Sequence, residues 1–151
     1  MSTQPTLFPE SPEAAIMRLD QSILNLILGY SGGPLGLALD SEAKAVLGCI
    51  RYQRGLANTI TISDIQERTK FNVRQIKKAV RTLRLNYNLP IGSSKRGNDG
   101  GYYLMISQDD QTAWVKDVLD QVRAELAVLR AAAGPQVTLE LLGQLQLEVK
   151  A

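Results

Sequence analysis

The fold is decided by residues 59–107, which read TITISDIQERTKFNVRQIKKAVRTLRLNYNLPIGSSKRGNDGGYYLMIS. After a β-rich start, Ser63 and Asn72 are each followed three positions later by glutamine. This capping-box spacing satisfies orphan backbone N–H groups at a helix start, and it predicts two helices, at about 64–69 and about 73–85. The first is brief, and only a short turn separates it from the second.

Two extended apolar segments follow, at residues 89–94 and 102–107. The link between them is rich in glycine and charge, which is typical of a β-hairpin with a long tip. Upstream, apolar residues at helical spacing predict a helix over about 41–53, ended by Gly55. The predicted order is therefore helix, strand, helix, turn, helix, strand, turn, strand.

The flanking sequence predicts more helix, so the fold class is mostly α with a small β-hairpin (α+β). A capped apolar-periodic run predicts one helix before the central region, and Asp109 or Asp110 caps a long one after it. The predicted organisation is a flexible tail (1–10), an N-terminal helix and connector (11–40), a central domain (41–108), a long C-terminal helix (109–133) and a C-terminal tail or short helix (134–151).

The central region resembles the winged helix-turn-helix family across about 70 of the 151 residues, most closely the small winged-helix proteins of phages and other mobile elements. In that family the second helix of the pair enters the major groove, and the hairpin wing contacts the backbone or minor groove. Two positions depart from the usual pattern: Gln66 stands where a small residue is usual, and Lys70 where glycine is frequent. The residues that carry the resemblance are 62–65, 69–72, Arg74, Ile76, 79–81, Leu83, 90–93 and 101–104.

Charge is distributed unevenly along the chain. The net charge is only +2, but residues 68–96 hold nine of the seventeen Lys and Arg residues and none of the fifteen carboxylates. A cationic segment in an otherwise acidic chain indicates an anionic partner, here double-stranded DNA. The candidate DNA-binding residues are Arg68, Lys70, Asn72, Arg74, Gln75, Lys77, Lys78, Arg81, Arg84, Lys95 and Arg96.

Four of these cations share one side of the second predicted helix. At about 100° per residue, Arg74, Lys77, Lys78 and Arg81 fall within an arc of about 100°, opposite the apolar side. A solvated surface is the alternative interpretation, but helices that face only water usually mix both signs of charge. The clustering therefore favours DNA binding.

The long C-terminal helix carries one continuous apolar stripe, with residues spaced three and four apart. The stripe packs either on its own domain or on a second copy of the chain. We favour a homodimer, because symmetric dimers are the commonest oligomers. The candidate dimerisation residues are Val115, Val118, Leu119, Val122, Leu126 and Leu129.

The composition favours no catalytic site, no metal and no cofactor. The chain has no histidine and one cysteine, Cys49, in an apolar-periodic run where a reduced core thiol is expected. Zinc, iron–sulfur and haem ligand sets, disulfides and histidine-based triads are thereby excluded. No nucleotide-binding glycine motif, targeting signal or membrane-length apolar run occurs, so we expect a cytoplasmic protein that is not an enzyme.

The leading hypothesis is a sequence-specific transcriptional regulator of a phage or mobile element. A replication or recombination accessory that binds DNA is one alternative. The other is a non-enzymatic winged-helix adaptor within a larger protein complex, whose terminal helices dock onto other subunits.

Overall fold

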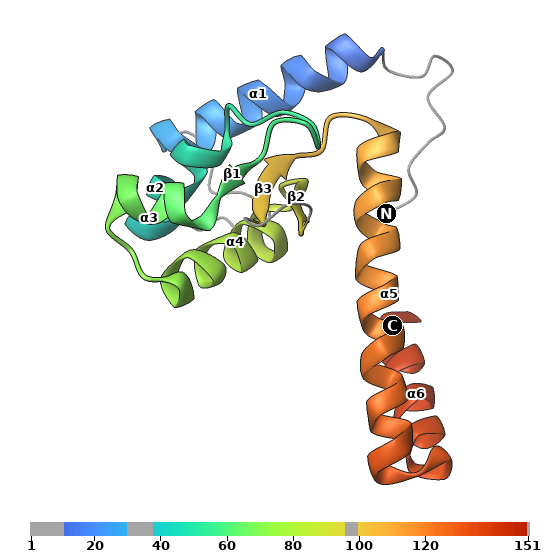
Figure 1. Ribbon diagram of the computed structural model, residues 1–151. Coiled ribbons are helices and arrows are strands. Elements are labelled where there is room, and N and C mark those ends of the chain that lie inside the picture. Colours follow the sequence, from blue (N-terminus) through green and yellow to red (C-terminus); the bar gives the residue numbers. More distant parts are fainter. Residues whose placement is uncertain (1–10, 30–37, 96–99, 151) are drawn as a thin grey trace. The chain divides into compact units, whose positions relative to one another are not determined.

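The computed structural model describes residues 11–29, 38–95 and 100–150, which form six helices and a small antiparallel sheet (Figure 1). The protein is therefore mostly helical with a minor β component, as the sequence predicts. The chain divides into two units, residues 1–111 and 112–151. The elements are α1 (Pro12–Leu28), α2 (Ser41–Ile50), β1 (Ile60–Thr61), α3 (Ile62–Thr69), α4 (Val73–Tyr87), β2 (Ile91–Ser94), β3 (Gly101–Leu104), α5 (Gln108–Ala133) and α6 (Pro135–Lys150).

The sheet has the strand order β1-β3-β2, and both pairings are antiparallel. Two glycines allow the strands to pack closely. A Cβ on Gly92 would lie 2.7 Å from Cζ of its cross-strand neighbour Tyr103. A Cβ on Gly101 would lie 2.7 Å from the carbonyl oxygen of Ile60 in β1. Both distances are shorter than real Cβ contacts, so a larger residue at Gly92 would displace the buried Tyr103 ring and one at Gly101 would displace the backbone of β1.

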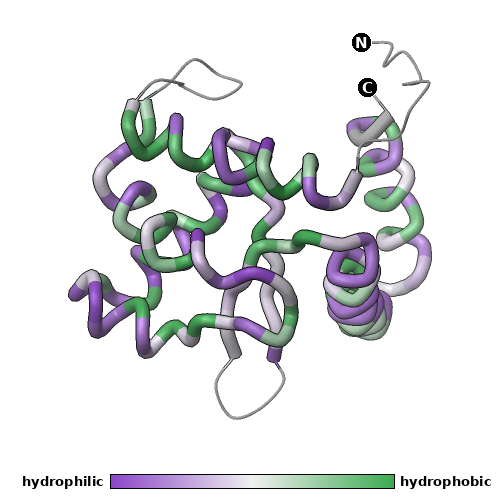
Figure 2. The backbone as a smooth tube through the Cα atoms, turned by 90° about the horizontal axis from the view of Figure 1, so that it is seen from above, coloured by the Kyte–Doolittle hydropathy of each residue, from purple (hydrophilic) through white to green (hydrophobic). Residues whose placement is uncertain are grey.

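Helices α1 to α4 and the sheet share a single hydrophobic core. Hydrophobic residues recur at short intervals along the helices (Figure 2), which gives each helix of this unit an apolar side to bury. Ile23 and Leu26 of α1 belong to the same buried cluster as Val46 of α2 and Ile76 of α4. The N-terminal helix is therefore part of the first unit's core.

Two helix ends and two strands differ from the sequence prediction, and tertiary hydrogen bonds form at both helix ends. Helix α2 stops at Ile50, short of residue 53, because Gln53 and Gly55 form hydrogen bonds to Leu104 instead. The Leu104 N–H donates to the Gln53 carbonyl at 2.7 Å, and the Gly55 N–H donates to the Leu104 carbonyl at 2.9 Å. Helix α4 continues to Tyr87, whose hydroxyl donates to the Ala38 carbonyl at 3.0 Å. The strands β2 and β3 are each four residues long, shorter than predicted.

Two helix caps also differ from the prediction. Thr61, not Ser63, caps α3: its hydroxyl accepts from the Asp64 N–H at 3.0 Å, so the helix begins directly where β1 ends. Ser107, rather than Asp109 or Asp110, provides the cap near the start of α5, because its hydroxyl accepts from the Asp110 N–H at 3.1 Å.

The carboxylate of Asp110 has a longer-range role. It accepts hydrogen bonds from the Ile106 N–H at 3.1 Å and from the Leu56 N–H at 3.3 Å. The segment before β1 and the first turn of α5 are thereby tied together within the first unit. No helix in the described part of the chain combines the length and apolar character needed to cross a membrane.

Candidate nucleic-acid interface

The turn between α3 and α4 is three residues long, and its first residue has an unusual backbone. Lys70 has φ 63°, in the left-handed region, and its N–H donates to the Gln66 carbonyl as the C-cap of α3. Phe71 packs against the hydrophobic core. The left-handed residue reverses the chain and the half-buried ring anchors it, so α4 leaves the turn in a defined direction.

The capping box predicted at the start of α4 is confirmed. The side chain of Asn72 accepts from the Gln75 N–H at 2.9 Å, and the side chain of Gln75 accepts from the Asn72 N–H at 2.9 Å. The Gln75 amide also donates to Glu42 of α2 at 3.4 Å. These two predicted DNA-binding residues therefore position α4 and bring one carboxylate to its N-terminal edge.

The opposite sides of α4 differ completely in chemistry. Ile76, Ala79, Val80, Leu83 and Tyr87 are buried in the core. Arg74, Lys77, Lys78 and Arg81 are all exposed, and we call these four residues the α4 cationic face.

The α4 cationic face forms no ion pair within the part of the chain that the structure describes. The ion pairs formed there, Arg54 with Asp20 and Arg123 with Asp120, involve none of its four members. Four unneutralised cations within one side of a helix repel one another. An external anion would remove that repulsion, so the arrangement can bind a polyanion through several groups at once.

Two further cations lie in and just before the turn that leads to this face. Arg68, in the last turn of α3, and Lys70 are both exposed. The charge of Arg68 also acts on the buried Cys49: burial raises the pKa of this thiol, and the nearby guanidinium opposes the rise. Cys49 is thus a neutral core thiol at physiological pH, as its sequence context predicts.

Arg84 is separated from the other predicted DNA-binding residues. It is half-buried, its Nε–H donates to the Ile91 carbonyl of β2 at 2.8 Å, and its guanidinium carbon lies 5.9 Å from the centre of the Tyr102 ring. Burial lowers the pKa of Arg84 and raises the pKa of Tyr102, and each opposes the other's shift. Arg84 therefore fastens α4 to the sheet from inside the domain.

The hairpin between β2 and β3 contributes one described cation. Lys95 follows β2 directly and is exposed, whereas the predicted partner Arg96 lies outside the described residues. Tyr102 and Tyr103 are both buried, so packing accounts for both rings. Neither tyrosine is available as a surface contact.

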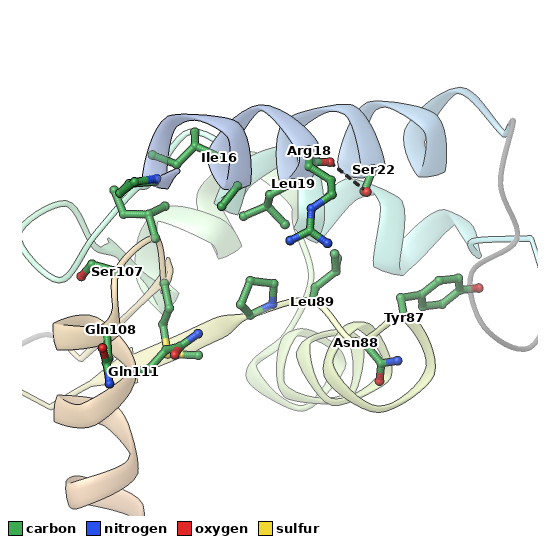
Figure 3. Close-up of a pocket in the computed structure, with 15 residues that line it drawn as sticks. Ile16, Arg18, Leu19, Ser22, Tyr87, Asn88, Leu89, Ser107, Gln108 and Gln111 are labelled. Carbon is green, nitrogen blue, oxygen red and sulfur yellow. Dashed lines mark hydrogen bonds between the residues drawn. The ribbon is translucent and has the colours of Figure 1, made fainter. Parts of the chain in front are cut away.

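An open groove of about 580 Å³ lies at the other end of α4, where Tyr87–Pro90 face α1 and the segment before α5. Figure 3 shows Leu19 of α1 and Leu89 inside it, with Gln108 and Gln111 at one side. No member of the α4 cationic face lines the groove, and its lining contains no carboxylate or thiol. It is thus chemically distinct from the cationic surface.

Sequence reasoning missed Glu42 and the internal role of Arg84. Glu42 is 33 positions from Gln75 in the sequence, so no local pattern links them. Arg84 did carry a local signal: it follows the buried Leu83 directly and lies three positions before Tyr87, at the edge of the apolar side. Comparisons of the chain with protein-family models, curated proteins and solved structures give no match.

Proposed function

We propose that this protein binds double-stranded DNA as a winged helix-turn-helix protein, with α4 in the major groove and the β2–β3 hairpin as the wing. The element order α2-β1-α3-α4-β2-β3 and the strand order β1-β3-β2 support this assignment. The observation that carries the proposal is the α4 cationic face, exposed and without an ion pair among the described residues.

The dimensions of α4 suit this role. Its fifteen residues make a rod about 22 Å long, and the major groove is about 12 Å wide and admits one α-helix. Arg74, in the first turn, is suited to reading a guanine, because arginine bonds O6 and N7 bidentately. Arg68 and Lys70 precede the helix and suit phosphates, which fix the register without reading sequence.

We further propose that the protein is a sequence-specific transcriptional regulator of a phage or mobile element. Base reading by a rigid helix supports specificity, because α4 is held by its capping box and by Arg84. Lys95, on the wing, is assigned to the phosphates. Roles as a replication accessory or as an adaptor are distinguished by the experiments below.

The first experiment tests whether the α4 cationic face binds DNA. Affinity for a duplex is measured by fluorescence anisotropy at several salt concentrations for two variants that each lose two cations. Lys77→Ala with Lys78→Ala should lower the slope of log K against log salt by about 1 to 2 per subunit. The matched control, Lys44→Ala with Arg18→Ala, removes equal charge from exposed positions on α2 and α1 and should leave the slope unchanged. Equal slopes for both variants would contradict the proposal.

The second experiment separates base reading from phosphate binding. Duplexes that the protein selects from a random pool are compared with scrambled duplexes of equal length. Arg74→Ala should lose about 1–3 kcal/mol of discrimination with a smaller effect on scrambled DNA. Lys95→Ala should weaken both equally.

The outcome of selection also separates the alternatives. Recovery of a discrete motif supports a regulator. Binding without any selected motif favours an accessory role, and absence of DNA binding favours an adaptor.

A further inference from the structure

The second unit leaves its hydrophobic side chains exposed. No residue in the 26 residues of α5 is buried. In the described part of α6 the buried residue is Thr138, which is polar, while Leu139, Leu141, Leu145 and Leu147 are all more than half exposed. The first unit, by contrast, buries its apolar side chains in one core. The α5–α6 hairpin, residues 112–150, therefore lacks a core of its own.

An apolar groove runs along the hairpin where its two helices meet. Its volume is about 350 Å³, and the aliphatic residues lining it are Leu126, Leu129, Val137, Leu141, Leu142 and Leu145, with Ala133. Figure 1 shows α6 returning alongside α5, so both helices contribute to one apolar surface. Two helices that bury so little apolar surface against each other are not stable in water by themselves. An exposed apolar groove of this kind marks a surface that packs against a partner.

The sequence of α5 specifies what fills the groove. Its apolar stripe follows a seven-residue repeat with Leu119 and Leu126 at positions a, and Val115, Val122 and Leu129 at positions d. Leucine at a, with β-branched valine at two of the three d positions, favours bundles of more than two helices. Two copies of the hairpin supply four helices.

The charges of this unit also fit a second copy. Residues 112–151 carry four cations and five carboxylates, so two copies do not repel strongly. Lys116, Arg123 and Arg130 occupy successive e positions, and Glu125 is at g. In parallel helices a g residue meets the e residue five positions on in the other helix, which pairs Glu125 with Arg130 of the second copy. In antiparallel helices the basic e positions would meet one another.

We propose that the α5–α6 hairpin is a dimerisation module, in which two copies form a four-helix bundle with their α5 helices parallel. This inference deepens the proposed function, because parallel α5 helices begin at the same end of the bundle. The two DNA-binding units then enter the bundle from one end, as binding to two half-sites of one duplex requires. Antiparallel helices about 39 Å long would start at opposite ends.

Sedimentation without DNA tests the association independently of the proposed function. The wild-type protein should be a dimer at tens of micromolar and Val122→Glu a monomer. The matched control is Val128→Glu, on the other side of α5 and 67% exposed, which should remain dimeric. A monomeric wild type, or equal loss of dimer in both variants, would overturn the proposal whatever happens with DNA.

Spin-label distances test the parallel arrangement in the full chain. The exposed residues Gln111 and Gln121 are replaced singly by cysteine in a Cys49→Ala background and labelled. Parallel α5 helices predict distances between copies that differ between the two positions by no more than about one helix diameter, about 10 Å, because no axial offset arises. An antiparallel pair centred on Val122 offsets the two labels along the helix axis by about 33 Å at 111 and by only about 3 Å at 121. That second result would refute the parallel arrangement.

Discussion

Lys70 occupies a position where glycine should be more stable. Its φ of 63° lies in the left-handed region, which costs an L-amino acid about 1–2 kcal/mol and costs glycine nothing. Glycine offsets about 0.5–1 kcal/mol of this gain in stability, because its more flexible unfolded chain loses more conformational entropy on folding. The side chain is exposed, so its removal sacrifices no packing. Lys70→Gly should therefore stabilise the fold by about 0.5–1 kcal/mol, up to a roughly fivefold shift in the unfolding equilibrium.

The same substitution removes a cation that we assign to DNA. Lys70→Gly should therefore be more stable and yet bind DNA less tightly, with a salt slope lower by about 1 if Lys70 contacts one phosphate. Lys70→Ala is the matched variant: it loses the same charge and keeps the backbone strain. Its DNA affinity should fall equally, while its stability should stay near that of the wild type.

Denaturant unfolding, at one protein concentration for all variants, measures the stability difference. If Lys70→Ala stabilises as much as Lys70→Gly, relief of charge repulsion is the cause and the backbone explanation is refuted. If Lys70→Gly is neutral, the left-handed backbone stores no strain. If neither variant weakens DNA binding, Lys70 lies outside the interface.

Two further predictions concern the first unit. Gly92→Ala should destabilise the fold by about 1–3 kcal/mol in denaturant unfolding, because the new methyl group meets the fully buried Tyr103 ring. Gly48→Ala, in α2 with no atom within 4 Å of the new methyl group, should instead stabilise the fold by about 1 kcal/mol. A similar loss of stability in both variants would contradict the steric explanation for Gly92. Burial raises the pKa of Tyr102 above its ordinary 10.0, so the unfolded chain loses this proton first and stability falls as the pH rises above 10. Tyr102→Phe should reduce that fall, measured as thermal midpoint against pH, and the exposed Tyr52→Phe should not.

The local sequence pattern was enough to predict the start of α4 and the separation of its apolar and cationic sides. The hydrogen bonds between Asn72 and Gln75 span three residues, so the sequence alone predicts them. Alternation of apolar and cationic residues at helical period also requires no tertiary information, because one side of the helix must enter the core. Exposure of the α4 cationic face follows from these two facts.

Local pattern failed wherever several residues satisfied the same rule. Thr61 and Ser63 are both good N-caps, and the end of β1, fixed by pairing with β3, selects Thr61. The end of α2 is similar: the chain leaves the helix because Gln53 and Gly55 gain hydrogen bonds to Leu104. Helical propensity contains no information about a partner fifty positions away.

The sequence by itself determined the α+β class, the amphipathic character of α4 and the presence of nine clustered cations, since all three follow from the order of residues along the chain without any contact between distant segments. Only the tertiary structure decided that Arg84 faces the sheet and that Glu42 lies beside α4. Arg84 is held within the domain by a β2 carbonyl, and Glu42 is brought to the edge of α4 by the packing of α2. Both outcomes arise from contacts between distant segments, whose geometry exists only after the core has formed.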